Sequence, residues 1–129
     1  MRRIIAVGLA VLSLTGCGPS EQGVVMTAES GVRKQLKDPD SARFQGSYFM
    51  LKDEDPSGYK RGNVCGVVSA KNSFGGYGSP IRFVAMASYS KNTEDVYRPI
   101  LEEPAESKNP STGFSAFETV YWNPNCLQK

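Results

Sequence analysis

The first seventeen residues constrain how the rest of the chain can fold. Arg2 and Arg3 precede an uncharged, mostly apolar run from Ile4 to Leu14, which is shorter than the about 20 apolar residues that a bilayer span needs. A positive start, an apolar run of this length and small residues after it are typical of a cleaved export signal. We therefore expect residues 1–16 to be a signal peptide and the remainder to fold in an oxidising, exported compartment.

The end of this stretch reads Leu14-Thr15-Gly16-Cys17, and it resembles the lipobox of bacterial lipoproteins. The resemblance implies that Cys17 carries a diacylglyceryl thioether and becomes an acylated (palmitate-type) first residue. Several acyl chains suffice for stable attachment to a lipid bilayer, so the expected location is the cell envelope. By the same resemblance, an aspartate directly after the cysteine favours inner-membrane retention. Gly18 is at that position instead, so we expect the outer membrane, with the domain facing the periplasm. An ordinary secretory signal with a cysteine nearby by chance is the alternative.

The part of the chain after the predicted signal is long enough for one domain with a modest core. We expect residues 17–23 to form the lipidated cysteine and a polar tether, and residues 24–129 to form a single domain. Arg2 and Arg3 belong to the signal, so 13 of the 15 Lys and Arg residues remain against 13 Asp and Glu residues. A domain without net side-chain charge gives no electrostatic reason to expect nucleic acid as a partner.

Cysteine usage points to one crosslink. With Cys17 lipidated, Cys65 and Cys126 form an even pair in a chain bound for an oxidising compartment. Compartment and count predict a Cys65–Cys126 disulfide, which would tie the C-terminus to the middle of the domain; two unpaired thiols are the alternative. There is no Cys-x-x-Cys spacing, which argues against a redox role.

Residues 24–37 have the pattern of an amphipathic helix. Their apolar positions recur every three or four residues, which places them on one face. Asp38 followed by Pro39 then predicts the end of that helix and the start of a short second helical turn, which aims Phe44 inward. The apolar positions are Val25, Ala28, Val32 and Leu36.

The pattern after Phe44 changes to short strands that are rich in Val, Phe, Tyr and Ile and bounded by Gly, Pro, Asn and Asp. In residues 81–89 the positions Ile81, Phe83, Ala85, Ala87 and Tyr89 are apolar with a period of two, and Arg82 and Ser88 lie on the opposite face, as in a half-buried strand. Short links favour antiparallel neighbours, so the sequence predicts an α+β fold with an N-terminal amphipathic helix packed on a small antiparallel β-sheet in meander order. Residues 102–113 are predicted to form a polar loop. The predicted strands are residues 47–52, 64–71, 81–89, 96–101 and 114–122.

Two segments read LKDPDSARF (36–44) and VCGVVSAKNSFGGY (64–77). They resemble a group of small exported proteins of bacteria and prophages that carry KDP-x-SA-x-F and then CG-x-V-x-AKNSFGGY after a short helix. The resemblance implies a coherent fold and implies no particular activity.

The second segment is a strand that runs into a glycine-rich turn. Glycines there permit positive φ, and Asn72 can hydrogen-bond to the turn backbone. We therefore identify Asn72, Phe74 and Tyr77 as a candidate binding loop in which the two aromatic side chains are anchors for a partner. The alternative is a hairpin loop whose aromatic side chains fold back onto the core. The spacing does not fit a phosphate-binding loop.

Residue types needed for most enzyme chemistry are missing. The chain has no histidine, which removes His-based triads, His metal sites and the usual acid or base near neutral pH. Ser88 and Lys91 match a Ser-x-x-Lys pattern, but a chain of this composition is expected to contain about one such match by chance. The acidic residues Asp53 and Asp55 fit a solvated turn. We expect no catalytic residues, no metal and no cofactor, so the protein is not predicted to be an enzyme.

The sequence therefore predicts a membrane-anchored envelope lipoprotein that acts as a small binding module. Its expected partners are the bilayer, through Cys17, and an envelope protein. The alternatives are a structural component of an envelope assembly and a phage-derived lipoprotein that excludes or inhibits a competitor; a small hydrolase without histidine is a third.

Overall fold

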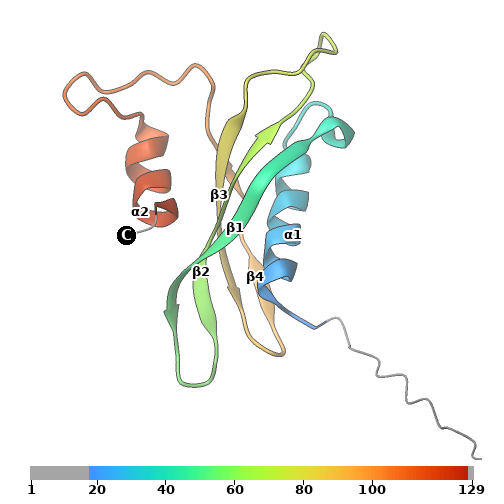
Figure 1. Cartoon of the computed structure of the whole chain (residues 1–129), viewed down its shortest axis with the longest axis vertical. Helices are drawn as coiled ribbons and strands as arrows, with labels where there is room; N and C mark the ends of the chain where they lie inside the picture. The colour runs from blue at the N-terminus through green and yellow to red at the C-terminus, as the bar shows by residue number, and fades with distance from the viewer. Residues whose placement is uncertain (1–17, 128–129) are drawn as a thin grey trace, which may run out of the picture.

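The computed structural model describes residues 18–127, which form one helix and a C-terminal helical arm on opposite faces of an antiparallel sheet (Figure 1). This arrangement confirms the predicted α+β fold. The predicted signal peptide and Cys17 lie outside the described residues. Within residues 18–127, no helix has the length and apolar character needed to cross a membrane.

Helix α1 (Glu21–Arg33) covers one face of the sheet. Ser20 caps it, because its hydroxyl accepts a hydrogen bond from the Gly23 N–H at 3.0 Å. The helix begins earlier than predicted, so the tether prediction for residues 17–23 is wrong at its C-terminal end: Glu21 to Gly23 are helical. Gly31 allows close packing, since a Cβ there would lie 2.9 Å from Pro99. The buried side chains of α1 are Val24, Ala28 and Val32.

A 3₁₀ turn, Pro39–Ser41, follows α1 and leads into the sheet, in agreement with the predicted second helical turn. All strand pairs are antiparallel, in the order β1-β2-β3-β4, and β5 also pairs with β3. The predicted strand 96–101 is in fact two short strands, because Pro99 has no N–H for a ladder hydrogen bond. The strands are β1 (Arg43–Glu54), β2 (Lys60–Ser69), β3 (Ile81–Tyr89), β4 (Glu94–Val96) and β5 (Ile100–Leu101).

The core between α1 and the sheet follows the period-two alternation of the strands. Alternate residues of β2 and β3 face α1 and are buried. Phe44 packs against this core, and its ring lies edge-on to that of Phe83 with the ring centroids 5.8 Å apart. This confirms its predicted inward position. The strand residues of this core are Val64, Val68, Phe83, Ala85, Ala87 and Tyr89.

The opposite face of the sheet is covered by the C-terminal arm, where the prediction of a strand at 114–122 is wrong. The π-helical turn η2 (Glu118–Trp122) and the helix α2 (Asn123–Cys126) lie there instead. Ser115 and Glu118 form a capping box: the Ser115 hydroxyl accepts from the Glu118 N–H at 3.1 Å, and the Glu118 carboxylate accepts from the Ser115 N–H at 2.8 Å. This local exchange starts a helix and overrides the strand-like composition.

Two independent links hold the arm on the sheet. A disulfide joins Cys65 of β2 to Cys126, with the Cα atoms 5.9 Å apart, which confirms the predicted pairing. Arg82 of β3 forms ion pairs with Glu102 and, at 3.0 Å, with Glu118. Every buried apolar residue that the structure describes lies between Val24 and Cys126. A chain that begins at Gly18 therefore contains the complete described core.

We predict that replacing both Cys65 and Cys126 with Ala lowers the free energy of unfolding by about 4 kcal/mol. The two cysteines are 61 residues apart. A cross-link that closes a loop of this length lowers the conformational entropy of the unfolded state, which is worth about 4 kcal/mol of stability. Urea unfolding of both proteins, with and without reductant, measures the effect. The variant should be insensitive to reductant, and a loss below about 1 kcal/mol would contradict the prediction.

The pairing of Arg82 predicts an acid-sensitive stability. Hydrogen bonds from Arg82 lower the pKa of the Glu102 carboxyl below its usual value; the Ser115 N–H and Arg82 lower the pKa of Glu118. A lowered folded-state pKa stabilises the fold above the unfolded-state pKa, and this contribution is lost as the pH falls through the folded-state pKa. Glu102→Gln should therefore reduce the decline in unfolding free energy between about pH 5 and pH 3.

Urea unfolding at each pH measures this decline. Glu103→Gln is the matched control, since Glu103 forms no ion pair within residues 18–127. It should keep the wild-type profile, and identical profiles for the two variants would refute the role of the Arg82 pair.

Candidate functional site

The candidate binding loop joins β2 to β3 at the end of the sheet that lies away from the start of α1 (Figure 1). A single β-bridge between Lys71 and Tyr77 closes it at its base. The loop is therefore a compact hairpin connection, and residues 71–78 are hereafter called the glycine-rich loop.

Asn72 organises the turn, as the sequence predicts. Its side-chain oxygen accepts hydrogen bonds from the backbone N–H groups of Phe74 (2.9 Å) and Gly76 (3.3 Å), and its own N–H donates to the Gly76 carbonyl at 2.8 Å. Gly75 has φ +81°, a backbone conformation that favours glycine. Asn72 is thus a structural residue of the loop, with its side-chain oxygen already occupied.

The two aromatic residues of the loop have different environments. The Tyr77 hydroxyl donates to the Ser41 carbonyl at 3.1 Å, and the Arg43 guanidinium lies 4.1 Å from the Tyr77 ring centroid. Tyr77 therefore fastens the loop to the 3₁₀ turn and to β1. Phe74 has 96% of its surface exposed, so the alternative in which both aromatic side chains fold onto the core is wrong for Phe74.

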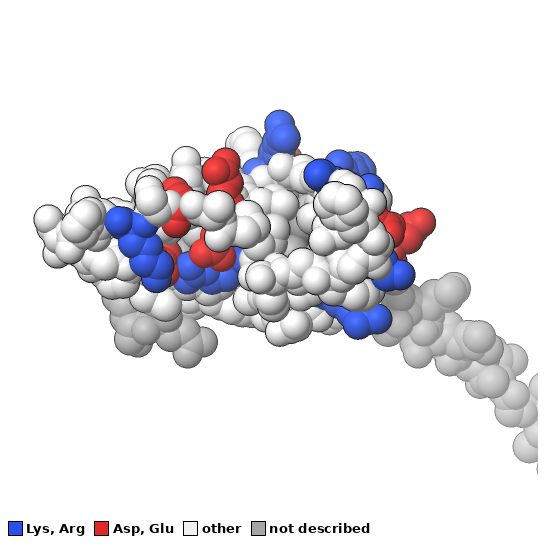
Figure 2. All heavy atoms as spheres, turned by 90° about the horizontal axis from the view of Figure 1, so that it is seen from above, with Lys and Arg blue, Asp and Glu red and all other residues white. Residues whose placement is uncertain are grey.

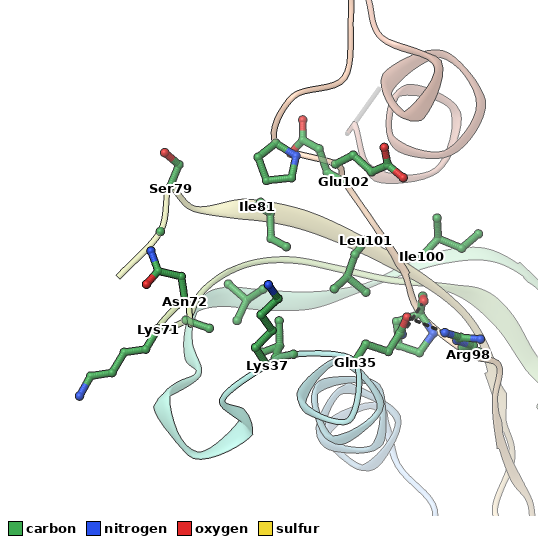
Figure 3. Close-up of a pocket in the computed structure, with 17 residues that line it drawn as sticks. Gln35, Lys37, Lys71, Asn72, Ser79, Ile81, Arg98, Ile100, Leu101 and Glu102 are labelled. Carbon is green, nitrogen blue, oxygen red and sulfur yellow. Dashed lines mark hydrogen bonds between the residues drawn. The ribbon is translucent and has the colours of Figure 1, made fainter. Parts of the chain in front are cut away.

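A cavity of about 700 Å³ adjoins the glycine-rich loop (Figure 3). Its floor is the end of β2 and the start of β3, one wall is the chain that follows α1, and the other wall is β5 with the residues on either side of it. In Figure 3, Ile81 and Leu101 point toward Lys37 across the cavity, whereas Lys71 extends away from it. The sequence did not reveal this cavity, because its lining comes from four separate segments, residues 35–37, 68–72, 78–81 and 98–104.

Seen from this end of the molecule (Figure 2), basic and acidic side chains lie next to one another in small groups, and most of the visible surface is uncharged. The glycine-rich loop itself contains one charged residue, Lys71. The loop therefore presents an exposed aromatic ring on a surface of little charge.

The acidic turn after β1 has a structural role. Asp53 pairs with Arg61 at 2.6 Å. The Asp55 carboxylate accepts hydrogen bonds from the Ser57 hydroxyl and from the N–H groups of Ser57 and Tyr59, and these hydrogen bonds lower the Asp55 pKa. Both carboxylates are therefore engaged in closing the turn. Within residues 18–127, no three His, Cys, Asp or Glu residues are grouped so as to hold a metal ion.

The Ser-x-x-Lys pattern does not start a helix. Ser88 is buried on β3, where its hydroxyl lies 2.7 Å from the Tyr59 hydroxyl. Lys91 lies three residues later, beyond the end of β3, and is exposed. Among the described residues, the Ser88 hydroxyl therefore forms its side-chain hydrogen bond with Tyr59 and forms none with a lysine.

No protein-family model, no curated protein and no solved structure matches this chain. The geometry of the described residues is therefore the basis of the functional proposals that follow.

We predict unequal stability effects for replacing the two aromatic residues of the loop. Tyr77→Ala should lower the free energy of unfolding by about 1 kcal/mol, because it removes the hydrogen bond to Ser41 and the contact with Arg43. Phe74→Ala should change it by less than about 0.5 kcal/mol, since the ring is exposed. Urea unfolding measures both, and a larger loss for Phe74→Ala than for Tyr77→Ala would contradict this assignment.

Proposed function

We propose that the protein is an envelope lipoprotein, anchored through Cys17, whose folded domain is a binding module that presents Phe74 to an envelope protein. The observation that carries the proposal is the nearly complete exposure of Phe74 on a loop that Asn72 and Tyr77 hold in one conformation. A large aromatic side chain on a rigid support loses little conformational freedom on binding, which makes it an effective interface anchor.

The distance between the anchor and the loop supports a protein rather than the membrane as the partner of Phe74. Only residues 18–20 separate Cys17 from α1, and three extended residues span about 10 Å. The 13 residues of α1 then rise about 20 Å toward the end that carries the glycine-rich loop (Figure 1). A domain attached through Cys17 would hold Phe74 away from the lipid surface.

The anchoring half of the proposal is tested by labelling cells with an alkyne analogue of palmitate. The wild-type chain should incorporate the label and sediment with membranes, and Cys17→Ser should do neither. Labelled Cys17→Ser protein would overturn the assignment of Cys17 as the acylated residue.

The binding half is tested by placing a photo-crosslinking amino acid at position 74 in intact cells. A discrete adduct with one envelope protein is expected from position 74 and not from position 26, where Met26 on α1 is 62% exposed and serves as a matched control. The purified partner should then bind Phe74→Ala at least about tenfold more weakly than wild type, as for a central aromatic anchor. Equal adducts from both positions, or equal affinity of the variant, would refute the role of Phe74.

A further inference from the structure

The cavity beside the glycine-rich loop is a second candidate site, and its chemistry differs from that of the exposed Phe74. Its volume of about 700 Å³ lies within the range of about 300–1,000 Å³ that is usual for small-molecule sites. Val68 on its floor is buried, and Ala70, Ile81 and Leu36 around it are half-buried. Apolar side chains that remain partly open to solvent favour an apolar ligand that covers them.

The polar groups of the cavity are unevenly distributed along it. At the end beside the glycine-rich loop are the Lys37 ammonium, the Asn72 side-chain amide and the Ser79 hydroxyl (Figure 3). Lys37 donates to the Ser73 hydroxyl at 3.2 Å and forms no ion pair within residues 18–127. This end of the cavity therefore offers a cation and neutral donors to an anionic group.

The remaining charged groups of the lining do not neutralise Lys37. Glu102 is paired with Arg82, and the Arg98 guanidinium donates to the Gln35 side chain at 3.3 Å. Glu103 is on the opposite wall, beyond β5. With the Glu102 carboxylate paired and Lys71 extending away from the cavity, Lys37 and Arg98 still outnumber the one remaining carboxylate, so the lining attracts an anion.

We propose that this cavity binds a single-chain amphiphile with an anionic headgroup, such as a fatty acid, with the acyl chain along Val68, Ile81 and Leu101 and the headgroup at Lys37. An acyl chain needs no hydrogen-bond partners in the apolar middle of the cavity. A peptide backbone would leave polar groups there without side-chain partners, which is costly. This proposal is independent of Cys17 and of the partner of Phe74.

The test uses the chain from Gly18 onward, which contains the complete described core and needs no detergent that would compete for the cavity; its folding is checked by circular dichroism and by formation of the disulfide. Myristate is titrated below its micellar concentration while two-dimensional NMR spectra are recorded. The expected result is saturable shifts of the Val68, Ile81 and Leu101 methyl groups. Absence of saturable shifts, or shifts confined to other methyl groups, overturns the proposal.

Headgroup recognition is tested with ligand and protein variants. Tetradecanol should bind about tenfold more weakly than myristate, and Lys37→Gln should remove this difference. Lys34→Gln is the matched control, because Lys34 is the C-cap of α1, three residues before Lys37, but lines a different hollow. Equal binding of the acid and the alcohol to the wild type, or an equal effect of the two lysine variants, overturns the role of Lys37.

Two further measurements define the site. Ala70→Phe places a ring in the cavity from a half-buried position and should abolish the myristate shifts while the remaining spectrum stays folded; if this variant does not fold, Ser79→Trp at the exposed rim is its substitute. Persistence of the shifts in the folded blocked variant refutes the location. Lysophosphatidylglycerol is compared with myristate to distinguish the two sources of an anionic single-chain amphiphile: tighter binding of the first identifies a lysolipid, and tighter binding of the second identifies a free fatty acid.

Discussion

The architecture depends on two central strands that carry apolar side chains on both faces. In β2, Val64 faces α1 while its neighbour Cys65 faces the C-terminal arm, and in β3 Phe83 and Val84 divide in the same way. A sheet with two apolar faces is stable in water only when both are covered. The helix covers one face mainly by apolar packing, and Thr27 adds a hydrogen bond to Glu94 of β4 at 2.7 Å. The short arm has less apolar surface, and the disulfide and the Arg82 ion pairs add the links that hold it in place.

The same covering elements determine where functional surfaces can lie. Because α1 runs along the sheet, residues 18–20, which precede the helix, lie at one end of the domain, and the glycine-rich loop lies at the other end. The cavity forms where α1 stops before the sheet does: Leu36 and Lys37 follow the end of the helix, and Val68 and Ile81 of the sheet extend beyond its last buried turn. The length of α1 relative to the sheet thus produces both the exposed loop and the cavity beside it.

Local sequence signals predicted only part of this site. Asn72 and Gly75 act within a few residues of their own positions, so the turn that they form could be anticipated. The different fates of Phe74 and Tyr77 could not, because Tyr77 is held by Ser41 and Arg43, more than 30 residues earlier in the sequence. The helical arm had a local signal that composition obscured: Ser115 and Glu118 have capping-box spacing, but the aromatic and β-branched residues between 114 and 122 favour a strand.

The sequence by itself determined the elements whose signals are local and periodic: the helix through its apolar stripe, β3 through its alternation, and the disulfide through an even pair of cysteines. These features depend on neighbouring residues or on simple counting. Only the tertiary structure decided the outward position of Phe74, the cavity at Lys37 and the place of the arm, because each results from segments that are distant in sequence and meet only when the sheet forms. Long-range contacts of this kind depend on shape and packing, which the order of residues along the chain does not display.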